Sequence, residues 1–189
     1  MDIRNATAAD IPYAAAILAA AFQDYPWTRW SIPAAHYQER LEELQGLYLY
    51  YALEHGIVLI NDKHQGVAAF LPPNVPEPNT ATQTRIAELL GDRIQAMLNT
   101  KIPQHPKDSW NLATIGVHPD NWGQGIASAL LADGLQRLDA IQAKVSLETS
   151  DSRNVTLYSR YDFNVTSLTQ IPHGPTVYSM LRERSDTNT

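Results

Sequence analysis

Two glycines between an apolar run and a helical pattern say most about the chemistry of this chain. The apolar run is Leu112 to Val117, the glycines are Gly123 and Gly125, and a helical pattern begins at Ile126. A strand, a glycine loop and a helix in this order leave backbone N–H groups free at the start of the helix. Such groups bind an anion without a charged side chain, so we interpret the loop as a site for a pyrophosphate.

Two further motifs compete with this interpretation of the loop. Gly123 to Ser128 is close to the dinucleotide fingerprint G-x-G-x-x-G/A, and Glu148 follows at about the distance of a ribose-binding acid. However, serine stands at the sixth position, and the chain before the loop lacks the alternating strands and helices of a doubly wound fold. No Gly-Lys-Ser/Thr follows, which excludes a Walker loop. An ordinary glycine turn stays open from the loop alone.

Carboxylate, phenol and imidazole groups near the loop could carry acid–base chemistry. Glu148 ends an apolar strand pattern, Tyr158 lies in a helical pattern, and His118 and His173 stand beside prolines. Each has a structural alternative, namely a solvated carboxylate, a buried helical tyrosine and turn histidines. The chain has no cysteine, which excludes a thiol nucleophile and disulfides, and without ligand-spaced His, Asp and Glu no metal is expected.

The composition narrows the class of protein. The chain has 189 residues, 44% of them apolar and 18% charged, as expected for one globular domain with a sizeable core. The net charge is −6 and no Lys/Arg run occurs, so no nucleic-acid partner is expected. Without a signal peptide or a long apolar run, we expect no membrane association and a cytoplasmic monomer or homodimer.

The elements that must position these groups follow from apolar periodicity and from Gly and Pro breaks. Helices are expected over about 7–24, 35–55, 82–98, 126–138 and 154–161. Strands are expected over about 57–60, 67–71, 110–117, 144–148, 163–168 and 176–182. We interpret 1–189 as a single domain, 72–108 as a Pro-bounded helical insertion packed on the main sheet, and 183–189 as a frayed tail.

Two signatures together resemble the GNAT family of N-acetyltransferases. The loop is similar to the family's first signature, Q/R-x-x-G-x-G/A, with Trp122, Gly125 and Ala127 at its fixed positions, and Leu147 to Phe163 is similar to the second. The resemblance implies an α/β fold with a mixed, mostly antiparallel central sheet and helices on both faces. Trp122 departs from the usual Gln or Arg, and Asp162 from the usual glycine, although Asp tolerates a left-handed backbone.

The resemblance implies acetyl-CoA as cosubstrate and transfer of the acetyl group to an amine. Without a cysteine, direct attack within a ternary complex is the simpler route. Tyr158 corresponds to the tyrosine that protonates the departing sulfur, and Asn154 could cap its helix, contact the cofactor, or both. The cofactor is expected on one strand and the loop, at Ile115, Gly116, Val117, Trp122, Gly123, Gln124, Gly125, Ile126, Ala127 and Ser128.

Gly116 interrupts an apolar strand. Such a glycine marks a bulge, a close approach of the backbone to a ligand, or a bulky neighbour. We expect the strand to offer its backbone groups to the cofactor, and the bulge and the bulky neighbour stay open as alternatives.

Glu148 is our candidate for the general base, with His118 and His173 as weaker alternatives. We expect the acceptor pocket between the first two helices and the last strands, where Tyr25, Trp27 and Trp30 could contact a flat or apolar amine. Core packing of the helix junction is the alternative for each aromatic residue. We expect the acceptor to be a primary amine of a small molecule, with a puromycin-like compound or another amine antibiotic as a candidate.

A function from another class is a catalytically silent CoA-binding module that serves as a sensor or interaction partner. Binding of acetyl-CoA without turnover of any amine would favour it.

Overall fold

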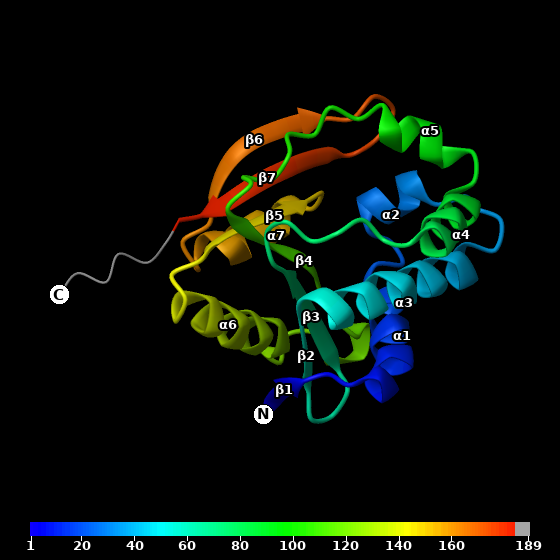
Figure 1. The fold of residues 1–189 in the computed structure, drawn as a ribbon. Coiled ribbons are helices and arrows are strands. Elements are labelled where there is room, and N and C mark those ends of the chain that lie inside the picture. The colour runs from blue at the N-terminus through cyan, green and yellow to red at the C-terminus, as the bar shows by residue number, and fades with distance from the viewer. Residues whose placement is uncertain (184–189) are drawn as a thin grey trace.

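A seven-stranded sheet forms the centre of the computed structural model, which describes residues 1–183 (Figure 1). The strand order is β1-β2-β3-β4-β5-β7-β6, and all neighbours are antiparallel except β4 and β5. The predicted mixed, mostly antiparallel sheet is therefore confirmed. Of the predicted frayed tail, residues 184–189 lie outside the described part of the chain.

Seven strands and seven α-helices make up the described part of the chain. The strands are β1 Ile3–Asn5, β2 Ile57–Asn61, β3 Gly66–Leu71, β4 Ser109–Val117, β5 Lys144–Thr149, β6 Asn164–Gln170 and β7 Thr176–Arg182. The helices are α1 Ile11–Ala21, α2 Pro26–Ser31, α3 Tyr37–His55, α4 Thr80–Leu90, α5 Arg93–Leu98, α6 Ile126–Asp139 and α7 Ser152–Ser159, with short 3-10 helices η1 Ala8–Asp10 and η2 Pro119–Asn121.

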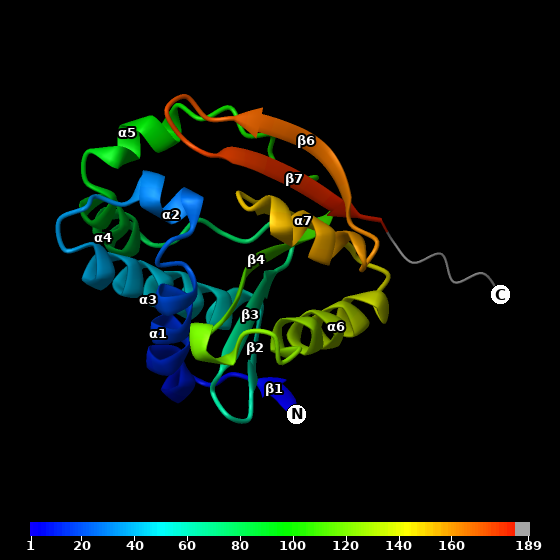
Figure 2. The ribbon, with the colours of Figure 1, turned by 180° about the vertical axis from the view of Figure 1, so that it is seen from behind.

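Helices cover both faces of the sheet, as predicted. Because side chains alternate along a strand, β2 and β3 bury apolar residues on both sides. Leu59, Ala68 and Phe70 pack with α6, whereas Val58, Val67 and Ala69 pack with α1 and α3. Figures 1 and 2 show α6 on one side and the α1–α3 pair on the other.

The sheet is interrupted between its two parallel strands. β4 and β5 pair only at their first residues, Ser109 to Asn111 against Lys144 to Ser146. The register between β3 and β4 shifts at Ala113, which has no partner on β3 and therefore forms a bulge. Beyond that point the edge of β4 that faces β5 is unpaired with any described strand, and the two strands diverge.

The Pro-bounded insertion packs its helices on α3, whereas its last residues contact β4 and β5 of the sheet. Leu89 and Leu90 of α4 are buried with Leu41 and Leu44 of α3. The single helix expected over 82–98 is wrong, because Gly91 adopts a φ of 53° and separates α4 from α5. The segment after α5, residues 99–108, returns to β4 without regular structure, and we call it the strap.

A buried carboxylate ties the N-terminus to the sheet. Asp10 accepts two hydrogen bonds of 2.8 Å from the Arg4 guanidinium and further bonds from Thr7 and His64. The hydrogen bonds from Arg4 hold the pKa of the Asp10 carboxyl well below its usual range. This cluster lies away from the opening between β4 and β5. Among residues 1–183, no helix is both long enough and apolar enough to cross a lipid bilayer.

Candidate active site

A cavity of about 500 Å³ lies where β4 and β5 diverge. Its walls come from the α1–α2 junction, α3, α4, the strap, both strands and α7. Most of the lining side chains are apolar or aromatic, and Glu148 is the single carboxylic acid side chain among the described residues that line it. The lining includes Phe22, Tyr25, Trp27, Tyr48, Tyr51, Ile86, Ile102, Asn111, Thr114, Ile115, Glu148, Asn154 and Tyr158.

The glycine loop joins the end of β4 to the start of α6 (Figure 2). Gly123 and Gly125 have φ values of 76° and 77°, and a Cβ on either would meet nothing within 4 Å. Among the described residues, no hydrogen-bond partner is present for the N–H groups of Gly123, Gln124, Gly125, Ile126, Ala127 and Ser128. Six consecutive free N–H groups around a helix start can bind a pyrophosphate, so the loop fits the predicted ligand.

The indole of Trp122 braces this loop. Its Nε1–H donates to the carbonyl oxygen of Val117 at 2.8 Å, while the residue is 62% exposed. His118 caps η2, where its Nδ1 lies 3.3 Å from the backbone nitrogen of Asp120, and it does not line the cavity. The structure thus gives His118 the structural role in a turn.

On β4, the three residues predicted for the cofactor face different surroundings. Ile115 lines the cavity, whereas Val117 is buried in the core beside α6. A Cβ on Gly116 would lie 2.7 Å from Leu18 Cδ2 of α1, so a bulky neighbour explains this glycine. The bulge lies at Ala113 instead.

Thr114 of β4 is a site residue that the sequence patterns did not predict. Thr114 Oγ1 is buried beside the cavity and has no hydrogen-bond partner among the described residues. A buried polar group without a partner is costly, and a ligand in the opening would supply the missing bond. The Thr114 hydroxyl and the unpaired edge of β4 can both form hydrogen bonds with amide groups. The opening is therefore suitable for the pantetheine arm of CoA, which contains amides.

Tyr158 of α7 lies at the cavity with its hydroxyl free. The residue is 6% exposed, its ring packs edge-on against Phe163, and the hydroxyl makes no hydrogen bond with the described residues. Burial raises the pKa of the Tyr158 phenol, and the nearby Tyr25 raises it further. The phenol therefore stays protonated and can donate a hydrogen bond to a ligand.

Asn154 does not cap its helix, which excludes one of the two roles that the sequence left open for it. Asp151 is the N-cap and accepts from the backbone N–H of Arg153 at 2.9 Å. Asn154 lies further into the helix, donates to Thr149 Oγ1 at 3.3 Å and lines the cavity. Asp162 has a φ of 64°, which confirms that Asp can replace the usual glycine before β6.

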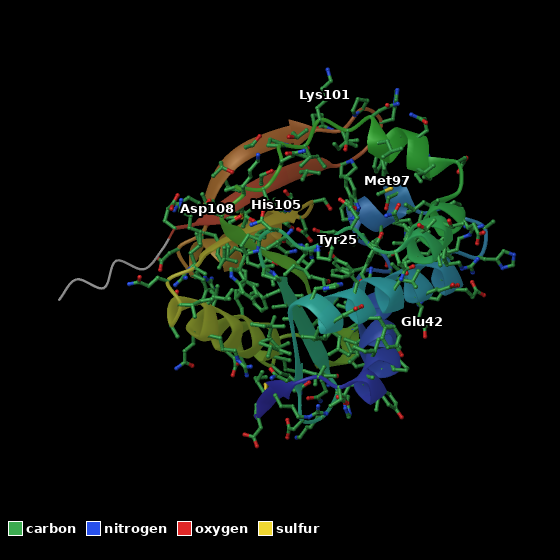
Figure 3. The ribbon with its side chains drawn as sticks, viewed as in Figure 1. Tyr25, Glu42, Met97, Lys101, His105 and Asp108 are labelled. Atoms are coloured by element: carbon green, nitrogen blue, oxygen red, sulfur yellow. The ribbon has the colours of Figure 1, made fainter. Side chains whose placement is uncertain are left out.

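Glu148 meets a histidine from the strap. Glu148 Oε2 lies 3.1 Å from His105 Nε2, and that nitrogen lies 2.6 Å from the side-chain nitrogen of Asn111. Figure 3 labels His105 on the strap and Tyr25 at the α1–α2 junction, two segments that lie near the same central region. His173, the other predicted alternative, sits at φ 55° in the turn between β6 and β7 and does not line the cavity.

The three aromatic residues predicted for the acceptor have different roles. The Tyr25 hydroxyl accepts from the Ser150 N–H at 2.7 Å and lies 2.9 Å from Thr149 Oγ1, so it ties the α1–α2 junction to the end of β5. Trp27 also lines the cavity. Trp30 does not: it packs against Trp27 and the turn at Gly174.

Comparison with known proteins agrees with this fold. The model of the family described as "Acetyltransferase (GNAT) family" matches residues 19–163. The chain is similar to a structure of histone acetyltransferase HPA2 and related acetyltransferase from Corynebacterium glutamicum, with 22% identity over 99% of this chain and 98% of that one and a TM-score of 0.78. It also resembles the ribosomal-protein-S18-alanine N-acetyltransferase of Escherichia coli (18% identity, 100% and 97% covered, TM-score 0.61) and the PaiA N-acetyltransferase of Thermoplasma acidophilum in complex with coenzyme A (12%, 96% and 98%, 0.62).

Proposed function

The chain belongs to the GNAT family of acetyltransferases, and we propose that it transfers the acetyl group of acetyl-CoA to a primary amine of a small molecule. The observation that carries this proposal is the placement of Glu148. It is the single carboxylate among the described residues that line a mostly apolar and aromatic cavity. A carboxylate there can attract an ammonium group and then accept its proton, while the walls receive an apolar body.

Acetyl-CoA fits two features of the site. The free N–H groups of Gly123 to Ser128 would hold the pyrophosphate, and the unpaired edge of β4 with Thr114 and Asn154 would hold the pantetheine arm. When bound, acetyl-CoA supplies an activated thioester. In this proposal Ile115, Gly116 and Val117 contact the cofactor through backbone groups of β4.

Glu148 and Tyr158 have complementary roles in this proposal. Glu148 takes a proton from the amine, which makes the nitrogen nucleophilic. Tyr158 stays protonated because burial raises its pKa, so its O–H can stabilise the negative charge that develops on the departing sulfur. A raised pKa makes full proton transfer less favourable, so we assign Tyr158 chiefly the role of a hydrogen-bond donor.

The acceptor has an apolar or aromatic body. Tyr25 and Trp27 form one wall, and Tyr48, Tyr51 and Ile86 form another. The stretches Ala20 to Pro26, Trp110 to Val117 and Leu147 to Ser150 resemble corresponding stretches of puromycin N-acetyltransferase. A puromycin-like aminonucleoside is therefore the first acceptor to test, followed by other amine antibiotics and by simple arylalkylamines.

Thiol release from acetyl-CoA, measured with this panel of amines, tests the proposal. We expect at least one aromatic primary amine to be acetylated, and the same amine to react far more slowly with Glu148→Gln, which keeps the shape of the side chain and loses the base. Acetyl-CoA binding with no turnover across the panel would instead support the catalytically silent module. Binding is measured separately by calorimetry, so a folded protein without activity is recognised as such.

A further inference from the structure

The strap carries two side chains toward the cavity. Between residues 101 and 108 all side chains are exposed except Ile102 and His105, which are half-buried. Ile102 lines the cavity, and His105 contacts Glu148. Pro103 and Pro106 flank the histidine and restrict the backbone on both sides of it.

The end of the strap is fixed to the sheet immediately after His105. Ser109 donates from both its backbone nitrogen and its Oγ to the carbonyl oxygen of Pro106, at 3.0 Å and 2.8 Å. Asp108 forms an ion pair with Lys144 of β5 at 3.2 Å. His105 is therefore held over β5 by a short, anchored segment.

We propose that His105 is a positioning residue that orients Glu148 for proton transfer from the acceptor amine. The proposal rests on the function proposed above, in which Glu148 is the base. His105 Nε2 engages Glu148 Oε2, and Oε1 makes no hydrogen bond with the described residues. The engaged oxygen fixes the carboxylate plane, and the free oxygen remains available to the amine.

The proposed pairing with Glu148 requires that Nε2 of His105 carries a proton. An ionised carboxylate only accepts, so Nε2 must donate to Glu148. The same nitrogen lies 2.6 Å from the side-chain amide of Asn111, a group that can present either its oxygen or its nitrogen to the ring. The arrangement is consistent when the Asn111 amide is turned, so that Nε2–H is shared between its oxygen and Glu148. The neutral ring is then the Nε2–H tautomer.

Among the described residues that line the cavity, no lysine or arginine side chain is present to orient Glu148. The groups that face Glu148 are His105 from the strap, Asn111 from β4, Ser179 opposite it on β7, and the Tyr25 and Tyr158 phenols across the cavity. Glu148 is the charged partner of His105 and Asn111 its neutral one, so the proposal requires that a defect in His105 reaches the reaction through Glu148.

Two substitutions distinguish a role of His105 as a hydrogen-bond donor to Glu148 from a role in which its ring takes up a proton. In His105→Gln the amide nitrogen can replace Nε2 as a neutral donor, whereas His105→Leu removes the donor. Loss of a hydrogen bond to a charged group predicts a fall in kcat/KM for the amine of about tenfold to a hundredfold in His105→Leu, with the KM for acetyl-CoA unchanged. His105→Gln should recover most of that loss, and the acid limb of its pH–rate profile should stay where it is in the wild type.

A double-mutant cycle identifies the route of the effect. In a Glu148→Gln background, His105→Leu should cost less than about threefold, because its partner carboxylate is already absent. An undiminished loss in that background would assign His105 to packing of the strap and overturn the proposal. A His105→Gln enzyme as poor as His105→Leu would also overturn it, since proton uptake by the ring would then be required.

A measurement without acceptor separates this proposal from the proposed function. Two-bond ¹H–¹⁵N ring correlations in the wild-type protein report which nitrogen of His105 is protonated. We expect Nε2–H, and a ring protonated only at Nδ1 would overturn the pairing. This result stands even if no amine in the panel is acetylated, which would refute only the proposed function.

Discussion

Replacement of Tyr158 by phenylalanine should remove catalytic power without disturbing the fold. The hydroxyl makes no hydrogen bond within the described residues, and the ring packs against Phe163, a contact that phenylalanine keeps. The free energy of unfolding should therefore stay within about 0.5 kcal/mol of the wild-type value. In the reaction, the variant loses a hydrogen bond to developing negative charge, worth about 1.5 to 3 kcal/mol, which corresponds to a fall in kcat of about tenfold to a hundredfold or slightly more.

The assay compares thiol release with acetyl-CoA binding. Steady-state kcat should fall in Tyr158→Phe, whereas the Kd for CoA from calorimetry should change less than about threefold, because the lost bond forms mainly as charge develops on sulfur. Tyr13→Phe is the matched control, since Tyr13 is a 62% exposed phenol on α1 far from the cavity. An unchanged kcat would refute the role of Tyr158, and an equal loss in kcat and CoA affinity would make it a binding residue.

Two further predictions concern the glycine loop and the hydrogen bonds between Arg4 and Asp10. Trp122→Gln should weaken CoA binding about twofold to tenfold in calorimetry, the worth of the neutral Nε1–H bond to Val117, and a loss beyond about a hundredfold would show that the indole contacts the cofactor. Asp10→Asn should lower Tm by about 4 to 8 °C at pH 7, because charge-assisted bonds worth about 2 kcal/mol are lost. Since the pKa of Asp10 is lower in the folded state, this stability exists above the unfolded value of about 3.9 and disappears at more acid pH, where the Tm values of the two proteins should converge.

The glycine loop and the flanking elements could be predicted because their signals are local. The two glycines, the apolar face of α6 and the second signature around Tyr158 are contiguous in sequence, and each specifies its own backbone conformation. Asp162 is a similar case, because the left-handed turn it must make depends mainly on its own side chain.

Features that depend on tertiary contacts could not be predicted. Gly116 has the sequence context of a bulge, but its surroundings are set by Leu18, which lies far away in the chain. His105 lies between two prolines in a segment without periodicity, so no local pattern connects it to Glu148. The break at Gly91 escapes prediction because the apolar pattern continues across it and only the backbone angle reveals the stop.

Because β4 and β5 pair over so few residues, the two halves of the sheet are only weakly coupled to each other. Strands β1 to β4 and strands β5 to β7 are connected through the sheet by three residue pairs alone among the described residues, and the walls of the cavity belong to both halves. A molecule that lies between β4 and β5 and forms hydrogen bonds with the free edge of β4 would restrict the motion of the two halves relative to each other. The donor should therefore complete the acceptor site by bracing its walls, which favours an ordered reaction in which acetyl-CoA binds first. Amide hydrogen exchange in β4 and β5 should slow when CoA is added.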